Sequence, residues 1–143
     1  MKPGYILKLV YISKRMTIGF YESVSSFDPL SEQTFKIAEF MREEGKHTMM
    51  AVKRLGELGI EAPKRGGEIA ERVGETIGKA VTVLGWRGTC LFMEFGGEVE
   101  RIFLKAASTV CRNRNDRDIL NLIIFDGKKH RTWWRRKLSE RRH

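Results

Sequence analysis

An acid and an imidazole lie one helical turn apart in the segment Glu44-Gly45-Lys46-His47. Between residues 30 and 58, apolar and small side chains recur at steps of three and four, and Glu44 and His47 fall within this stripe. Both are therefore predicted to point into a helical core, where a carboxylate must be paired, hydrogen-bonded, protonated or metal-bound. A Glu and a His at i and i+3 are what carboxylate di-iron bundles use. The plain alternative is a solvated face rich in Glu and Lys, with an incidental His.

Acids recur on the apolar stripes of two later segments. A helix that begins after Gly85 or Gly88 carries Glu98 on its predicted inward side. The apolar residues of that side are Leu91, Phe95, Val99, Ile102 and Phe103. Past the polar break at 112–115, another helix has an acid and an imidazole on one side, as in the first segment. Its inward residues include Ile119, Leu122, Ile123, Asp126, His130, Trp133 and Trp134.

The remaining segments also have helical spacing. A first helix ends near residue 25, a second begins at a Ser31 cap and ends at 56–59, and residues 60–67 form a connection. The helix after it contains Gly74 and Gly78, a small-residue pair that allows close packing on a neighbouring helix. The alternative is that this helix lies on a membrane surface. No stretch alternates with period two. The sequence therefore predicts an all-α fold.

Length and composition limit the function classes. The 143 residues suffice for one globular core, and 27 Lys and Arg against 18 Asp and Glu give a formal charge of +9. This charge favours nucleic acid, anionic lipid or an acidic protein as partner. The two cysteines form no metal-binding spacing, and no run is apolar enough to span a membrane. Residues 1–21 are basic and free of acids, like a mitochondrial presequence, but their apolar pattern continues into the fold, so we place them in the domain.

The order and spacing of several short motifs resemble those of the demethoxyubiquinone hydroxylases, membrane-associated di-iron enzymes that hydroxylate a quinone ring in ubiquinone biosynthesis. The motifs cover most of the chain and comprise Phe40-Met41-Arg42-Glu43-Glu44-Gly45-Lys46-His47, Leu55-Gly56-Glu57-Leu58-Gly59, Pro63, Gly78-Lys79-Ala80 and Leu84-Gly85-Trp86-Arg87-Gly88. The resemblance implies a single ferritin-like four-helix bundle over residues 1–143, with an additional short helix between its second and third helices.

Carried over residue by residue, the resemblance implies that Glu44, His47, Glu98 and His130 derive from metal ligands. Two of the family's ligands have no match in this chain. The family's spacing from the second-helix Glu back to the first-helix Glu leads from Glu44 to Lys14, and the Glu expected three residues before His130 is replaced by Gly127. Two irons need several anionic ligands to balance their charge, so the chain is expected to hold no cofactor. The remnant ligands are Glu44, Glu98, His47, His130 and Asp126, the last of which could rescue one position in a mononuclear site.

Lys14 shares a stripe with Val10 and Tyr21, so its ammonium is predicted to reach the bundle centre beside Glu44 and Glu98 and replace the metal charge. An equally weighted alternative is a surface lysine whose stem lies along an amphipathic helix. Gly96 and Gly97, beside Glu98, are expected to serve helix packing, with room for an apolar ligand as the alternative.

Residues 128–143 form a basic, aromatic C-terminal tail. Its predicted lipid or phosphate contacts are Trp133, Trp134, Arg135, Arg136 and Lys137. Closure of the core by the two Trp residues is the alternative.

We expect a non-catalytic subunit of a multiprotein complex on the matrix side of the mitochondrial inner membrane. Expected partners are other subunits and anionic lipid, with quinone or RNA also compatible. One alternative is an active di-iron monooxygenase that binds iron, and a second is an RNA-associated subunit of a mitochondrial ribosome.

Overall fold

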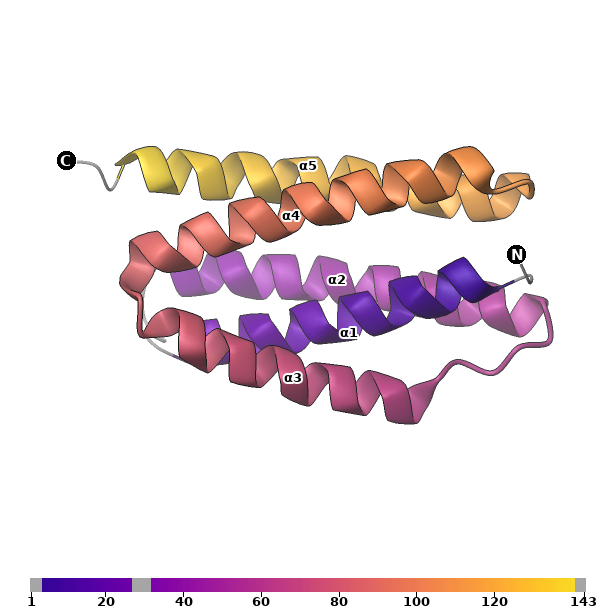
Figure 1. The fold of residues 1–143 in the computed structure, drawn as a ribbon, viewed down its shortest axis with the longest axis horizontal. Helices are drawn as coiled ribbons and strands as arrows, with labels where there is room; N and C mark the ends of the chain where they lie inside the picture. The colour runs from indigo at the N-terminus through magenta and orange to yellow at the C-terminus, as the bar shows by residue number, and fades with distance from the viewer. Residues whose placement is uncertain (1–3, 27–31, 141–143) are drawn as a thin grey trace. The chain divides into compact units, whose positions relative to one another are not determined.

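A computed structural model of the chain describes residues 4–26 and 32–140, and within these ranges the regular structure is helical, with five helices and no strand (Figure 1). The helices are α1 (Tyr5–Ser25), α2 (Glu32–Glu57), α3 (Lys64–Thr82), α4 (Gly85–Val110) and α5 (Arg114–Glu140). The all-α prediction is confirmed. The predicted cap Ser31 lies outside the described residues.

One expectation about helix bounds is wrong. The additional helix predicted to be short is α3, which has 19 residues and includes Gly66 and Gly67 of the expected connection. Pro63 immediately precedes it, and a proline at a helix start loses no intrahelical hydrogen bond. The basic, aromatic tail predicted from residue 128 is the last part of α5, which ends at Glu140.

The chain divides into two compact units, Met1–Ala80 and Val81–His143, which are described in turn. A single domain over residues 1–143 stays a prediction. No helix among the described residues is both long enough and apolar enough to cross a membrane.

In the first unit, α1 and α2 pack antiparallel (Figure 1). Their stripes recur every three to four residues, as expected for helices that each bury one side. The rings of Tyr21 and Phe40 lie 6.5 Å apart between the two helices. The buried apolar side chains they contribute include Leu7, Val10, Tyr11, Phe20, Tyr21, Val24, Ile37, Phe40, Ala51 and Leu55.

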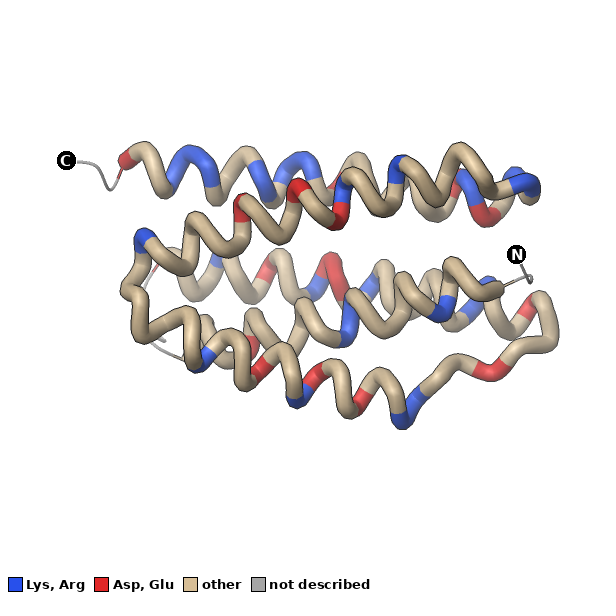
Figure 2. Tube along the Cα trace, in the orientation of Figure 1, with Lys and Arg blue, Asp and Glu red and all other residues tan. Residues whose placement is uncertain are grey.

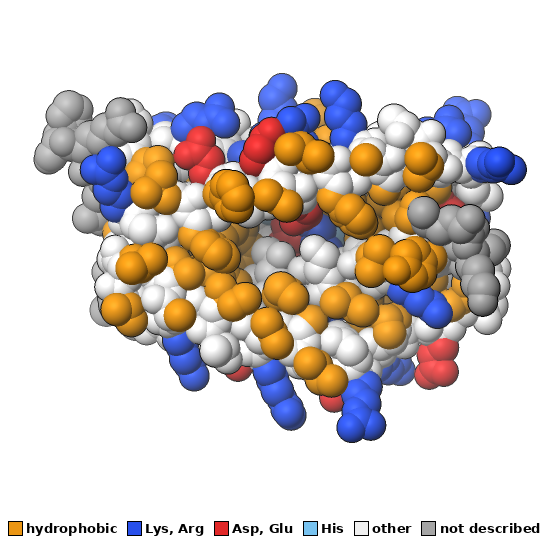
Figure 3. Space-filling view, in the orientation of Figure 1, with side chains coloured by type: hydrophobic (Ala, Val, Ile, Leu, Met, Phe, Trp, Pro, Cys, Tyr) orange, Lys and Arg blue, Asp and Glu red, His pale blue; other side chains and the backbone are white. Residues whose placement is uncertain are grey.

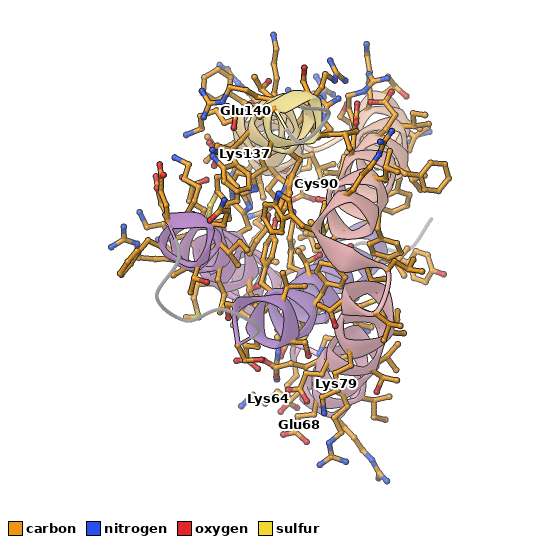
Figure 4. The ribbon with its side chains drawn as sticks, turned by 90° about the vertical axis from the view of Figure 1, so that its left-hand side faces the viewer. Lys64, Glu68, Lys79, Cys90, Lys137 and Glu140 are labelled. Atoms are coloured by element: carbon orange, nitrogen blue, oxygen red, sulfur yellow. The ribbon has the colours of Figure 1, made fainter. Side chains whose placement is uncertain are left out.

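Helix α3 packs on α1 through glycines. A Cβ added to Gly74 would lie 2.0 Å from the carbonyl oxygen of Met16, and one added to Gly19 would lie 2.0 Å from that of Glu71. Gly78 is similarly tight against Ser23 and Phe20. The prediction that Gly74 and Gly78 allow close helix packing is confirmed. The opposite, solvated side of α3 carries charged residues, of which Lys64, Glu68 and Lys79 are labelled in Figure 4.

In the second unit, α4 and α5 pack antiparallel (Figure 1). The rings of Trp86, Trp133 and Trp134 form one cluster, with centroid separations of 4.8 to 6.3 Å. Other buried apolar residues are Cys90, Leu104, Ala107, Leu120, Ile123 and Leu138.

The side of α4 that was predicted to face inward faces solvent. Phe95 is 72% exposed and Ile102 is 56% exposed, whereas Cys90 and Leu104 on another side of the helix are buried. The prediction was wrong because periodicity shows that α4 has an apolar side, but not whether that side packs on α5 or faces outward.

Candidate functional site

The most deeply buried charges described in the first unit are Lys14 and Glu44. Lys14 lies on α1 and Glu44 on α2, and the antiparallel packing brings Nζ to 2.7 Å from Glu44 Oε2. The two side chains are only 2% and 4% exposed. Lys14 is therefore buried, as the stripe of α1 predicts, and is not the surface lysine of the alternative interpretation.

His47 lies one turn beyond Glu44 and completes the cluster. Its side chain is 2% exposed, and its Nδ1 is 3.7 Å from Glu44 Oε2. One residue further, the Thr48 hydroxyl donates a hydrogen bond of 2.9 Å to the backbone carbonyl of Glu44, within α2. We call Lys14, Glu44 and His47 the buried charge cluster.

The electrostatics of this cluster follow from its burial. A carboxylate that is removed from water requires a compensating charge or hydrogen bonds, and the Lys14 ammonium supplies the compensating charge at 2.7 Å. The pair as a whole is neutral. A dinuclear iron centre needs several anionic ligands, whereas this cluster offers one carboxylate and one imidazole beside an ammonium, so it does not fit such a centre.

Glu98 lies at the edge of the contact between α4 and α5, and its side chain is 42% exposed. Its Oε1 is 2.6 Å from Arg101 Nη2, and its Oε2 is 2.8 Å from Arg131 Nη1. Hydrogen bonds from Arg101, with the charges of both arginines, lower the pKa of Glu98. The expected inward orientation of Glu98 was therefore wrong, because two guanidinium groups hold the carboxylate at the surface.

The other two remnant ligands both lie on α5. His130 is buried, at 5% exposed. The Asp126 side chain is 20% exposed, and its Oδ1 is 3.8 Å from Lys129 Nζ. At Gly127, where the resemblance leads us to expect an acid, an added Cβ would meet no atom within 4 Å, so no close contact accounts for the glycine.

Within each unit, the described residues bring together no group of three or more His, Cys, Asp or Glu side chains that could hold a metal ion. The structure thus joins Glu44 to His47 and to Lys14. Glu98 instead lies beside Arg101 and Arg131. The proposed roles of the remnant ligands stay predictions.

The two arginines around Glu98 were missed at the sequence level. Arg101 follows Glu98 at i+3, a spacing at which opposite charges on a helix pair, so this contact could have been found. Arg131 lies 33 residues away, and only the register of α4 on α5 brings it to Glu98. No local signal predicts that register.

The predicted lipid or phosphate contacts separate into two groups. Trp133 and Trp134 are buried, at 7% and 1% exposed, as the alternative of a core-closing pair describes. The basic side chains reach the surface to different degrees, since Arg135 and Arg136 are 66% and 64% exposed and Lys137 is 15% exposed. Arg135 pairs with Glu94 at 2.9 Å, and Lys137 pairs at 3.1 Å with Glu140 on the same helix (Figure 4).

No protein-family model, curated protein or solved structure matches the chain. The geometry above is therefore what a functional proposal has to be built on.

Proposed function

We propose that this chain is a non-catalytic helical subunit of a larger assembly, derived from a ferritin-like quinone hydroxylase whose metal charge has been replaced by that of Lys14. The observation that carries the proposal is the buried pair of Lys14 and Glu44, with 2.7 Å between Nζ and Oε2. The assembly that the family resemblance implies is mitochondrial and membrane-associated.

Charge balance explains why such a core holds together without metal. In a di-iron bundle, buried carboxylates are compensated by metal cations, and without compensation each would destabilise the fold. One ammonium beside Glu44 offsets one such charge. An ammonium activates no dioxygen, so this substitution supports a structural role and not hydroxylation.

A subunit role is supported by the unusual surface of the second unit. Large apolar side chains on α4 remain exposed, among them Phe95 at 72% and Val99 at 51%. Extended apolar patches on soluble proteins mark places where another molecule binds. The chain is thus better suited to binding than to enclosing a substrate.

Metal analysis of the full-length wild-type protein tests the proposal. We expect no stoichiometric iron after expression in iron-supplemented medium, and no Co²⁺ absorption bands on titration. The Lys14→Glu variant replaces the ammonium by a third donor beside Glu44 and His47, and we expect it to gain Co²⁺ binding.

A matched variant, Lys36→Glu, makes the same charge change at an exposed position on α2 and should gain nothing. Two tightly bound irons per wild-type chain, lost in His47→Ala, would overturn the proposal in favour of the active monooxygenase.

A further inference from the structure

One side of α4 forms an apolar surface along the length of the helix. We define the α4 face as the exposed residues Leu91, Phe92, Phe95, Val99, Ile102, Phe103 and Val110. They are between 39% and 72% exposed. At about 100° per residue they occupy about one third of the helix circumference, and this third contains no charged residue. Figure 3 shows apolar side chains gathered over α4.

The area of the α4 face is sufficient for a dimer of this chain. With about 200 Å² for the whole surface of a phenylalanine, the Phe residues of the face expose on the order of 300 Å², and its aliphatic residues expose a similar area. About 600 Å² is at the upper limit of the apolar patches on monomeric proteins. Two copies that covered this face in each other would bury on the order of 1,200 Å², the area at which specific protein interfaces begin.

Charged residues follow one border of the α4 face, and their order is complementary to itself in an antiparallel pair of helices. Glu94, Glu98, Arg101 and Lys105 lie within about 60° of one another around the helix. A two-fold axis between antiparallel helices brings the same border of each copy together. With this axis between residues 99 and 100, Glu98 lies opposite Arg101 of the other copy, and Glu94 lies opposite Lys105. Figure 2 shows acidic residues in the middle of α4 and basic residues towards both ends.

Gly96 fits the same arrangement. It lies at the other border of the α4 face, and a Cβ added to it would meet no described atom within 4 Å. Glycine disfavours a helix relative to alanine, so a contact outside the single chain is one reason for a glycine here. With the axis between residues 99 and 100, the residue opposite Gly96 is Phe103 of the other copy, and the missing side chain leaves room for its ring.

We propose that two copies of this chain form an antiparallel dimer through their α4 faces. Burial of the phenylalanine and aliphatic side chains provides the affinity. The ion pairs of Glu94 with Lys105 and of Glu98 with Arg101, each formed between the two copies, determine the register.

The two glutamates can accept these contacts in addition to their ion pairs within the chain. Glu94 lies 2.9 Å from Arg135 and Glu98 lies 2.8 Å from Arg131, both on α5. An ionised carboxylate has about four acceptor positions, so each glutamate can also contact a cation of the second copy.

The basic charge of α5 does not oppose this dimer. Trp86 contacts Trp133 and Trp134 of α5 on the side of α4 that lies about 180° around the helix from Phe95. The two α5 helices would therefore lie on the outer sides of the α4 pair, three helix spacings of about 8 to 10 Å apart. This separation exceeds the Debye length of about 8 Å at physiological ionic strength, so repulsion between the two helices is screened.

The inference goes beyond the proposed function, because it depends on the second unit alone. It does not depend on the buried charge cluster or on the proposed loss of metal binding. A chain that bound two irons could form the same dimer, and a metal-free chain could stay a monomer, so metal analysis and the mass in solution test the two proposals separately.

Sedimentation equilibrium of the full-length chain over a range of concentrations tests the inference. We expect the mass of the wild type to rise to twice that of one chain, with a dissociation constant on the order of micromolar. Val99, which is 51% exposed, lies beside the two-fold axis. Val99→Glu brings two carboxylates together in an apolar interface, so it should weaken the dimer at least about a hundredfold.

The matched control is Phe35→Glu, which also introduces a carboxylate at an exposed apolar residue, 69% exposed, but on α2. It should dimerise as the wild type does. Circular dichroism should be unchanged in both variants, because each replaces an exposed side chain.

A charge exchange between copies tests the register. Lys105→Glu and Glu94→Lys should each weaken self-association by about tenfold, because each places like charges opposite one another twice in the dimer. In a mixture of the two variants, opposite charges again face each other, and heterodimers should form about as tightly as the wild-type dimer. An affinity tag on one variant measures the heterodimers by co-purification of the untagged one.

Three results would overturn the inference. The first is a wild-type chain that stays monomeric at about 100 μM, two orders of magnitude above the expected dissociation constant, which would leave the α4 face to lipid or to a different protein. The second is a dimer that Val99→Glu leaves intact, because its interface would lie elsewhere. The third is a mixture of Lys105→Glu and Glu94→Lys that recovers no binding, because the antiparallel register would then be wrong.

Discussion

Each unit pairs a glutamate with cationic side chains across two antiparallel helices, but the two units do so in opposite environments. Lys14 and Glu44 are 2% and 4% exposed, whereas Glu98 is 42% exposed beside Arg101 and Arg131. Water and salt screen the second arrangement and hardly reach the first. Two ion pairs of similar length, 2.7 and 2.8 Å, are therefore expected to differ greatly in what they contribute to folding.

The two units also differ in the atoms that surround a helix glycine. In the first unit, a Cβ on Gly74 would meet the backbone of Met16, which cannot move without displacing α1. In the second unit, a Cβ on Gly97 would meet Cγ and Cδ of Arg131, part of a flexible side chain. The contact at Gly74 therefore cannot adjust to an added methyl group, whereas the contact at Gly97 can.

The largest effect is expected from Lys14→Met. Loss of one member of a buried pair leaves the other charge uncompensated, which costs about 3 to 5 kcal/mol of unfolding free energy. Replacing both members by apolar residues, as in Lys14→Met with Glu44→Leu, should recover most of the loss. Urea unfolding followed by circular dichroism measures each variant, and the coupling between the two sites follows from a double-mutant cycle.

Lys36→Met provides the control, because Lys36 pairs with Glu39 at 3.2 Å on the exposed surface of α2. Its effect should stay within about 1 kcal/mol. If Lys14→Met were as mild as this control, burial of the pair would not determine the stability of the first unit.

The next largest effect is expected from Gly74→Ala. The added methyl group would lie 2.0 Å from the Met16 carbonyl oxygen, so α1 and α3 must separate, at a cost of about 1 to 3 kcal/mol or more. Gly45→Ala, on the open side of α2, should instead stabilise by up to about 1 kcal/mol, because alanine favours helix and meets no atom within 4 Å. Thermal unfolding distinguishes the two directions.

Gly97→Ala extends the glycine test to the second unit. Arg131 can move away from the new methyl group, so the loss should be clearly smaller than in Gly74→Ala. An equal loss in both variants would show that α4 and α5 are held as rigidly as α1 and α3.

Periodicity was sufficient to predict which sides of α1 and α2 are buried in the first unit. The stripe through Val10 and Tyr21 indicated that Lys14 points inward, and the stripe of α2 indicated the same for Glu44. Two antiparallel helices with these stripes place their central residues together. The position of the buried charge cluster was therefore predictable, although its 2.7 Å contact was not.

The second unit was harder to predict because the side of α4 that is richest in large apolar residues is not the side that packs on α5. Leu104 and Ile102 are two residues apart and equally apolar, yet one is buried and the other is 56% exposed. Only the packing of α5, with Trp133 and Trp134 against Trp86, determines which side is covered. That choice depends on contacts far apart in the sequence, which local periodicity does not encode.

A smaller effect is expected from Glu98→Gln, and its sign depends on pH. Because arginine partners lower the pKa of Glu98 in the folded state, its stabilisation is present above the pKa of the unfolded chain. That stabilisation is lost as the pH falls through the lowered value. The variant should therefore be less stable than wild type at pH 7 and equal to it in strong acid.

Unfolding free energies along a pH series, repeated at high salt, measure this effect. High salt should remove the difference between Glu98→Gln and wild type but leave that between Lys14→Met and wild type largely intact. Persistence of the Glu98 effect at high salt would contradict the contrast between an exposed and a buried pair.

The smallest effect, with the opposite sign, is expected from Glu22→Gln on α1. Burial, followed by the charge of Glu71 and the carboxyl group of Glu75, raises the pKa of Glu22 in the folded state. A raised acid pKa means that ionisation disfavours folding, so the wild type is relatively most stable below the unfolded pKa and loses stability as the pH rises through the folded value.

The uncharged glutamine avoids this loss. Glu22→Gln should thus be slightly more stable than wild type at pH 7, with the gain disappearing in acid, in the same pH series used for Glu98→Gln. Because Glu22 is only partly removed from water, the gain should be small and should shrink with salt. Parallel pH profiles for the two variants would contradict the assignment, since a carboxylate held by arginines and one crowded by carboxylates must respond to protonation in opposite directions.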